Sequence, residues 1–302
     1  KRPMEPGDMP ISKIFISVFL PMIVFGIIGW FIPGNIMNSD SNDAFIFACL
    51  PVVYFFITLF TRANQMDKKP IGALLAIFLV SVFFWAVFKQ NGTALTTWAQ
   101  FYTDRQVSPA LEKPLSAIYM VEKVKTSADS VVRYDNNFKV VKENGVVVKE
   151  WGDDVYLRNM NPAKIPDDGS SIHILNTELF QSINPFWVIV LTPLLVWFWS
   201  VLRRRKREPS TPVKIALGLF ITALSTLCMV GAVMASQNGL VKSSPLWLVA
   251  TYGVITIGEL CLSPMGLSLV SKLSPPRLTA LLMGGWFLAT SIGNKLSGIL
   301  AS

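Results

Sequence analysis

The segment PLWLVATYGVITIGELCLSPMGLSL occupies Pro245–Leu269, and Glu259 is its only charged residue. It exceeds the roughly 20 residues that an α-helix needs to cross the hydrocarbon core of a bilayer. A carboxylate in the middle of such a helix is costly, so it is a candidate functional group. The segment therefore predicts a membrane-spanning helix that carries a functional carboxylate.

The composition of the whole chain excludes a soluble domain. Of its 302 residues, 52% are hydrophobic and 15% are charged, and the mean hydropathy is +0.47. That balance is too apolar for a surface in water. The net charge is +8, but the basic residues cluster between apolar runs, which indicates membrane topology and no nucleic acid partner. The three cysteines lie in separate apolar runs, so we expect no metal and no cofactor.

Seven apolar segments are long enough to span a bilayer. Most begin beside a proline, which the first turn of a helix tolerates because the missing N–H would be unpaired there. The seven are Ile11–Ile32, Asp43–Thr61, Pro70–Phe88 with an amphipathic continuation to about Gln100, Pro185–Leu202, Pro212–Ala235, Pro245–Leu269 and Leu278–Leu300. The fold class predicted is an all-α polytopic membrane protein.

Basic residues alternate between the loops, as the positive-inside rule requires. They concentrate in three loops, at Arg62–Lys69, Arg203–Lys214 and Lys272–Arg277. By contrast, Pro33–Asn42 has no Lys or Arg, and Ser236–Ser244 has only Lys242. We therefore expect the chain to begin on the cytoplasmic side and to end outside.

The loop Phe101–Leu179 lies outside by the same rule. It contains FKVVKENGVVVKEW, in which two β-rich runs flank Asn144–Gly145, the strongest short-range signal for a β-hairpin. We predict a small external β-rich insertion over residues 101–179. It is either a decoration without function or a contact for an envelope or accessory protein. His173, the only histidine, lies here, which argues against a histidine proton relay inside the membrane.

Two ionisable residues stand out inside spans, where a charge costs at least about 2.5–3.5 kcal/mol at mid-bilayer. They are Lys89 and Glu259. Lys295 lies near the outer end of its span, from which its stem can reach the headgroups. For Lys89 the alternative is an interfacial tail beyond Phe88, and for Glu259 it is a structural salt bridge.

Polar side chains at helical spacing form stripes on three spans. The stripes are Trp85, Lys89, Thr93 and Thr96; Tyr252, Thr256, Glu259 and Ser263; and Trp286, Thr290 and Asn294. Pro264 removes a backbone hydrogen bond, so we expect its helix to kink or open beside a cavity. Asn184, where the fourth span begins, is either an N-cap or a site residue.

Four stretches carry a family signature. They are FFWAVFKQNGTALTTWA from Phe83, QSINPFW from Gln181, GELCLSPMGLSLVSKLSP from Gly258 and MGGWFLATSIGN from Met283. Together they resemble the proton-dependent oligopeptide transporter (POT) family of the major facilitator superfamily. The resemblance implies a linker helix hairpin over residues 1–69 and a C-terminal bundle over 70–302 that lacks the last helix. The N-terminal bundle is missing too, so the chain is expected to be inactive alone.

The resemblance also implies a function, the symport of di- and tripeptides with protons across the bacterial plasma (inner) membrane. Glu259 matches a glutamate that holds the peptide's amino end, and Asn184 matches an asparagine that contacts peptide backbone. Trp286 and Trp85 match aromatic residues in the pocket and just below it. At Lys89 the family usually has a proton-coupling glutamate, so coupling is expected through Glu259, through Lys89, or through an acidic partner on the missing bundle.

Two other classes of function compete with this prediction. A different major facilitator, an exporter or importer of another small solute, would share the spans but should lack the clustered motifs. An intramembrane enzyme needs a nucleophile with a base, or a metal cluster, inside the spans, and the sequence offers neither. The expected partners are peptides, protons, membrane lipids and the missing bundle.

Overall fold

The computed structural model describes residues 10–34, 36–37, 39–135, 138–143, 145–166 and 169–301. Within this part of the chain, six helices are long and apolar enough to cross a membrane. They are Ser12–Trp30, Asp40–Thr61, Gln65–Phe101, Glu178–Arg204, Thr211–Ala235 and Leu246–Leu273. Six of the seven predicted spans thus form helices of the required length. The seventh forms helix α11 (Thr279–Ala301); Asn294 and Lys295 make it less apolar than the six, and it stays a predicted span.

The chain folds into two compact units. The first unit comprises Lys1–Lys89, Ser210–Ile215 and Cys261–Ser302. The second unit comprises Gln90–Pro209 and Ala216–Leu260. Helices α9 and α10 each contribute to both units. The division predicted at residue 70 stays a prediction.

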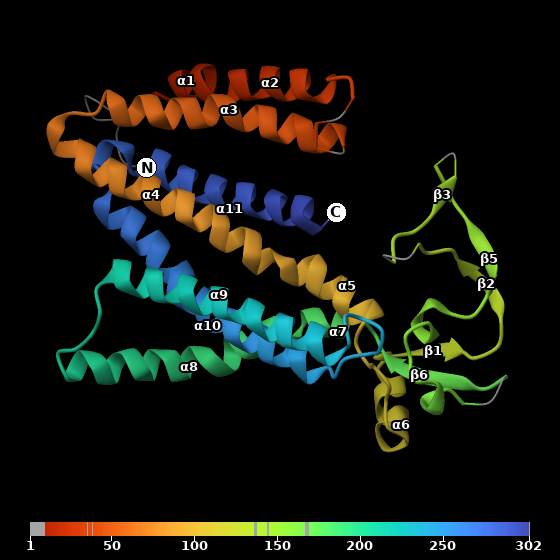
Figure 1. Cartoon of the computed structure of the whole chain (residues 1–302). Helices are drawn as coiled ribbons and strands as arrows, with labels where there is room; N and C mark the ends of the chain where they lie inside the picture. The colour runs from red at the N-terminus through yellow and green to blue at the C-terminus, as the bar shows by residue number, and fades with distance from the viewer. Residues whose placement is uncertain are drawn as a thin grey trace. The chain divides into compact units, whose positions relative to one another are not determined.

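The first unit begins with an antiparallel helix hairpin (Figure 1). One arm contains α1 (Ile11–Ile14), a π-helical turn η1 (Phe15–Phe19) and α2 (Leu20–Trp30), and the other is α3 (Asp40–Thr61). Gly29 lets the arms approach closely, since a Cβ there would lie 2.6 Å from the carbonyl oxygen of Asp43. The buried Asp43 carboxylate closes the connecting loop by accepting hydrogen bonds from the Ile36 and Met37 N–H groups, each at 2.8 Å.

Helices α4 (Gln65–Phe88) and α11 lie side by side in the first unit (Figure 1). The small residues Ala289, Gly293 and Ser297 are buried along α11, where small side chains let two helices approach closely. A Cβ on Gly293 would lie 2.7 Å from the carbonyl oxygen of Val82. Close backbone approach therefore holds this helix pair together.

The third predicted span is interrupted after helix α4, which corrects the prediction of one helical face that continues beyond Phe88. After Phe88 the chain forms a 3₁₀ turn η2 (Lys89–Gly92) and then a separate helix α5 (Ala94–Phe101). Asn91 and Gly92 are poor helix formers, and Thr93 between the two helices has φ −127° and ψ −94°, outside the helical region. The single helical face predicted for Trp85, Lys89, Thr93 and Thr96 is therefore wrong.

The second unit contains α7 (Glu178–Gln181), α8 (Ile183–Arg204) and most of α9 (Thr211–Ala235), together with the first half of α10 (Leu246–Leu273). Apolar side chains on α8 remain exposed, among them Ile189 at 75% and Trp197 at 67%. Lipid, not water, suits such a face. Helix α10 continues through Pro264 without a break, so it does not open there. The alternative, a kink at Pro264, stays a prediction.

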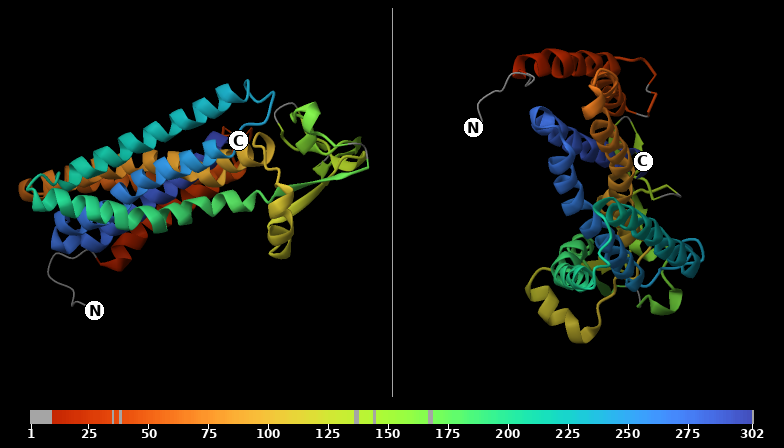
Figure 2. Two further views of the ribbon diagram at one scale, coloured as in Figure 1. Left: turned by 90° about the horizontal axis from the view of Figure 1, so that it is seen from below. Right: turned by 90° about the vertical axis from the view of Figure 1, so that its left-hand side faces the viewer.

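The insertion in the second unit contains α6 (Pro109–Ala117) and three two-stranded antiparallel sheets (Figures 1 and 2). The sheets pair β1 (Val121–Lys125) with β6 (Ser171–Leu175), β2 (Asp129–Val132) with β5 (Lys149–Gly152), and β3 (Lys142–Glu143) with β4 (Val146–Val147). The β3–β4 hairpin forms where the sequence predicted it. Gly145 has φ +79°, as its turn requires, and Asn144 lies outside the described residues.

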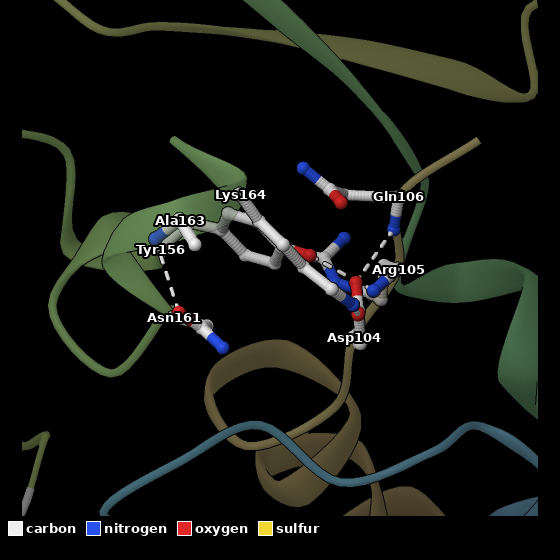
Figure 3. A network of polar contacts seen from close by, with 7 residues as sticks. All are labelled: Asp104, Arg105, Gln106, Tyr156, Asn161, Ala163 and Lys164. Atoms are coloured by element: carbon white, nitrogen blue, oxygen red, sulfur yellow. Dashed lines mark hydrogen bonds and ion pairs between the residues drawn. The ribbon is translucent and has the colours of Figure 1, made fainter. Parts of the chain in front are cut away.

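Polar contacts tie the insertion to the chain that leaves α5 (Figure 3). The Arg105 N–H donates to the hydroxyl of the buried Tyr156 at 2.8 Å, and Lys164 forms an ion pair with Asp104 at 2.8 Å. His173 in β6 pairs with Glu112 at 3.1 Å. The histidine therefore has a local partner within the insertion.

Candidate functional site

The second unit brings two of the predicted site residues into contact. The Asn184 amide donates to the Thr256 hydroxyl oxygen at 3.0 Å and approaches a Glu259 carboxylate oxygen at 3.4 Å. The Thr256 hydroxyl in turn donates to the carbonyl oxygen of Tyr252 at 2.6 Å. Since Glu259 lies halfway along α10, this polar cluster lies near the middle of a predicted span.

Asn184 is held by the first turn of α8. The helix starts at Ile183 and its N-cap residue is Ser182, so the N-cap alternative for Asn184 is not realised. Its side chain points instead to α10. Asn184 is in the first turn of α8 and contacts Glu259 of α10. The Glu259 carboxylate therefore lies near the N-terminus of α8, where the helix macrodipole favours negative charge.

One tryptophan and one tyrosine form hydrogen bonds that hold α10 beside its neighbours. The Trp187 indole N–H donates to the carbonyl oxygen of Val249 at 3.0 Å, and its ring lies over Gly253. The hydroxyl of the fully buried Tyr252 donates to the carbonyl oxygen of Asn91 at 3.2 Å. The interruption after α4 therefore supplies a backbone acceptor to α10. Sequence patterns gave no signal for this contact, because Asn91 appeared to belong to a continuous helix.

Gly258 has a packing role that its position beside Glu259 did not reveal. A Cβ at Gly258 would lie 2.1 Å from the Thr222 hydroxyl oxygen and 2.8 Å from the carbonyl oxygen of Gly218. Helix α9 can approach α10 only because residue 258 is glycine. Since consecutive residues are about 100° apart around a helix, packing Gly258 against α9 directs Glu259 to a different face.

The two candidate tryptophans lie in the first unit, and both are buried. Trp286 is 4% exposed and lies against Gly266, where a Cβ would be 2.1 Å from the ring. Phe78 contacts it edge-on, with centroids 6.4 Å apart. Trp85 is 8% exposed and packs edge-on against Phe88. Its indole N–H is buried and has no hydrogen-bond partner among the described residues.

Lys89 caps the end of α4 and is half-buried. Its ammonium group lies 5.8 Å from the centre of the Trp85 ring and 5.7 Å from that of Phe88. Aromatic faces attract a cation at such distances. No carboxylate in the described part of the chain forms an ion pair with Lys89, so the aromatic faces are its observed contacts.

Of the four substrate-binding candidates, Asn184 and Glu259 contact each other in the second unit, while Trp85 and Trp286 lie in the first unit against different neighbours. A single cavity lined by all four stays a prediction. The described residues contain no group of three or more His, Cys, Asp or Glu side chains arranged to hold a metal ion.

The fold and the polar cluster define a class of protein. Long apolar helices carry a carboxylate and an amide at membrane depth, as in membrane proteins that move a solute. The chain is an integral membrane protein, and we assign it to the bacterial plasma (inner) membrane. Residues 165–302 match the family model described as POT family.

Curated relatives agree with this assignment. The uncharacterized transporter YclF of Bacillus subtilis is 30% identical over 83% of this chain and 38% of its own length. The peptide transporter YePEPT of Yersinia enterocolitica is 30% identical over 94% of this chain and 43% of its own length. Dipeptide and tripeptide permease A of Proteus mirabilis is 40% identical over 41% of this chain and 25% of its own length. The chain spans less than half the length of these relatives.

Solved structures agree on the fold. A crystal structure of the peptide transporter POT in complex with sulfate superposes with a TM-score of 0.60 and 24% identity, over 96% of this chain and 45% of that one. The family resemblance read from the motifs is confirmed. The relatives that match are transporters.

Proposed function

We propose that this chain is part of a secondary active transporter that carries di- and tripeptides together with protons across the bacterial plasma membrane. The family match and the peptide-transporting relatives support this proposal. The observation that carries it is the contact between Asn184 and Glu259 halfway along α10. Alternating-access transporters place their substrate sites at that depth.

The chemistry of the two side chains suits a peptide. The Glu259 carboxylate attracts the peptide's ammonium group in a low-dielectric site. The Asn184 amide donates to Thr256 and Glu259, which leaves its carbonyl oxygen to accept a peptide N–H. Trp286 and Trp85 contribute aromatic walls, and residues from outside this chain complete the pocket.

Symport requires that the proton and the peptide be bound at the same time. A proton and a peptide ammonium group compete for the Glu259 carboxylate, and competition at that site alone would exchange them, so a second group must carry the proton while Glu259 holds the peptide. Lys89, at the motif position where the family usually has a proton-coupling glutamate, contributes to coupling by pairing with an acidic group outside this chain. The finer roles of Lys89 and the two tryptophans rest on the family motif alone.

The second candidate function is the transport of another small solute by a major facilitator. Uptake by the full-length protein in liposomes separates the two. We expect an inward proton gradient to drive accumulation of labelled dialanine, and unlabelled tripeptide to compete while free alanine does not. Uptake that ignores the proton gradient, or that free alanine blocks as well as tripeptide does, would overturn the proposal.

A further inference from the structure

The first unit contains a basic groove at the ends of its helices. The groove has a volume of about 450 Å³, and its lining includes Lys13, Ser17, Tyr54, Thr58, Arg62 and Arg277. They come from α1, η1, α3 and the 3₁₀ turn η5 (Pro276–Leu278). The predicted topology places all these helix ends on the cytoplasmic side.

The charge of the basic groove is only partly neutralised. Arg277 forms an ion pair with Asp67. Lys13 and Arg62 are exposed, and no described carboxylate forms an ion pair with either of them. Two cations and several hydroxyl groups therefore face one hollow at the level of the lipid headgroups. Such basic pockets between membrane helices suit an anionic headgroup.

A second groove, which is apolar, shares Tyr54 with the first. It has a volume of about 360 Å³ and is lined by Leu50, Val53 and Ile57 of α3 and by Ile292 and Leu296 of α11, among others. At about 1.5 Å per residue, α3 rises roughly 16 Å between Leu50 and Thr61. The α3 side of the groove between Leu50 and Ile57 therefore lies in the inner half of the ~30 Å hydrocarbon core. Helix α11 runs outward from Thr279, so Ile292 and Leu296, roughly 20–26 Å along it, lie in the outer half.

We propose that the two grooves together bind one anionic phospholipid of the cytoplasmic leaflet. The phosphate lies between Lys13 and Arg62, and one acyl chain follows α3 past Ile57 and Val53. The combination of cations with an apolar groove is complementary to a lipid and not to a free anion. A zwitterionic lipid carries its own cation, so net charge favours an anionic headgroup such as phosphatidylglycerol.

The lipid has a structural consequence. Phe56 of α3 contacts Phe78 of α4 edge-on at 6.3 Å and lies where a Cβ on Gly285 of α11 would be. On either side of this contact the two grooves separate the helix hairpin from the rest of the unit. A bound phospholipid fills that separation and fastens the hairpin to α11.

Native mass spectrometry of the full-length protein in detergent, titrated with phosphatidylglycerol or phosphatidylcholine, tests the proposal. We expect the first phosphatidylglycerol to bind more tightly than phosphatidylcholine. In the double variant Lys13→Gln/Arg62→Gln its Kd should rise about 10- to 30-fold, since each basic residue near a lipid surface contributes about a fivefold factor or slightly less. The matched control Lys68→Gln/Lys69→Gln removes the same charge from outside the groove and should change Kd less than about twofold.

Three further comparisons test whether the variants remain folded and whether the bound molecule is a lipid and not a free anion. Lys13→Arg/Arg62→Lys keeps both charges and should bind as wild type does, which excludes misfolding. Val53→Trp fills the apolar groove and should weaken binding of long-chain phosphatidylglycerol, whereas Val196→Trp on the exposed face of α8 should not. Equal losses in the two double-glutamine variants, or displacement of the lipid by millimolar inorganic phosphate, would overturn the proposal.

Discussion

Single glycines determine the positions of the side chains predicted to form the functional site. Gly258 lies against Thr222, Gly266 against Trp286, and a Cβ on Gly293 would lie 2.5 Å from the Cβ of Trp85. Each glycine belongs to one of the motifs that signal the family, so these motifs have a physical reason. The glycines leave room for a neighbouring helix or an indole ring, and a methyl group would remove that room.

Replacing Gly266 with alanine should destabilise the full-length protein by about 1–3 kcal/mol, the usual cost of overpacking, because the new Cβ meets the Trp286 ring. Gly284→Ala is the matched control, since nothing lies within 4 Å of the added carbon there. Alanine should stabilise that helical position by up to about 1 kcal/mol. Thermal unfolding followed by tryptophan fluorescence measures both. Equal melting temperatures for the two variants would contradict the packing role.

Lys89 offers a second test of a single residue. Because its ammonium group contacts aromatic faces and no described carboxylate, Lys89→Gln should change how dipeptide uptake depends on external pH between about 5.5 and 8. Lys295→Gln, near the outer end of α11, should leave the profile as it is in the wild type. Superimposable profiles for wild type and Lys89→Gln would remove Lys89 from the coupling mechanism.

Helices and strands were predicted more reliably than their ends and interruptions. Apolar length predicted the spans, and the Asn144–Gly145 pair predicted the β3–β4 hairpin, because turn chemistry is local. The 3₁₀ turn at Lys89–Gly92 was missed, although Asn91 and Gly92 signalled it, because polar residues at helical spacing on both sides concealed the break. The contact between Asn184 and Glu259 was implied only through the family motif, since spacing along the chain cannot pair two distant helices.

The α9–α10 loop is joined to the insertion by hydrogen bonds whose strength should depend on pH. The Lys242 ammonium donates to the carbonyl oxygen of Phe101 at 3.0 Å and lies 3.8 Å from the Tyr156 ring. Burial and the neighbouring Arg105 lower the pKa of Lys242 to about 7, while Asp104 and Asp154 oppose the shift. The folded loop therefore binds this proton less tightly than the unfolded loop, whose lysine has a pKa near 10.5.

The folded α9–α10 loop should become more stable as pH rises from about 7 toward 10.5. Over that range the cost of burying a charged Lys242 disappears, because the folded loop has released the proton that the unfolded loop still binds. Hydrogen exchange at the Ser243 and Asp104 amides, which form the inter-segment backbone bonds, reports loop opening after correction for the intrinsic exchange rate. Protection should rise between pH 7 and 9 in wild type and in Lys164→Met. In Lys242→Met it should be flat. The same rise in Lys242→Met would mean that another group titrates.

The orientation of the whole molecule follows from its basic loops. We expect position 205 to lie inside and the β3–β4 hairpin outside. In a variant without native cysteines, a membrane-impermeant thiol reagent should label Val146→Cys in intact cells, and should label Arg205→Cys only after the membrane is opened. External labelling of position 205 would reverse the assigned topology, and with it the cytoplasmic location of the basic groove.

This chain spans less than half the length of its relatives. The sequence and the fold therefore lead to Asn184 and Glu259, but not to any residues outside the chain that complete the proposed pocket. The position of the Glu259 carboxylate in the middle of α10 nevertheless leads to one strong prediction.

That prediction concerns Glu259→Gln in the full-length protein, measured as accumulation of labelled dialanine in liposomes with an inward proton gradient. The amide keeps the size of the side chain but lacks the charge that holds a peptide ammonium group and the basicity that binds a proton. Concentrative uptake should be abolished while the protein elutes and melts as wild type does, and Glu178→Gln in α7 should transport normally. Uptake and affinity near wild type in Glu259→Gln would mean that the carboxylate is structural and would contradict this account.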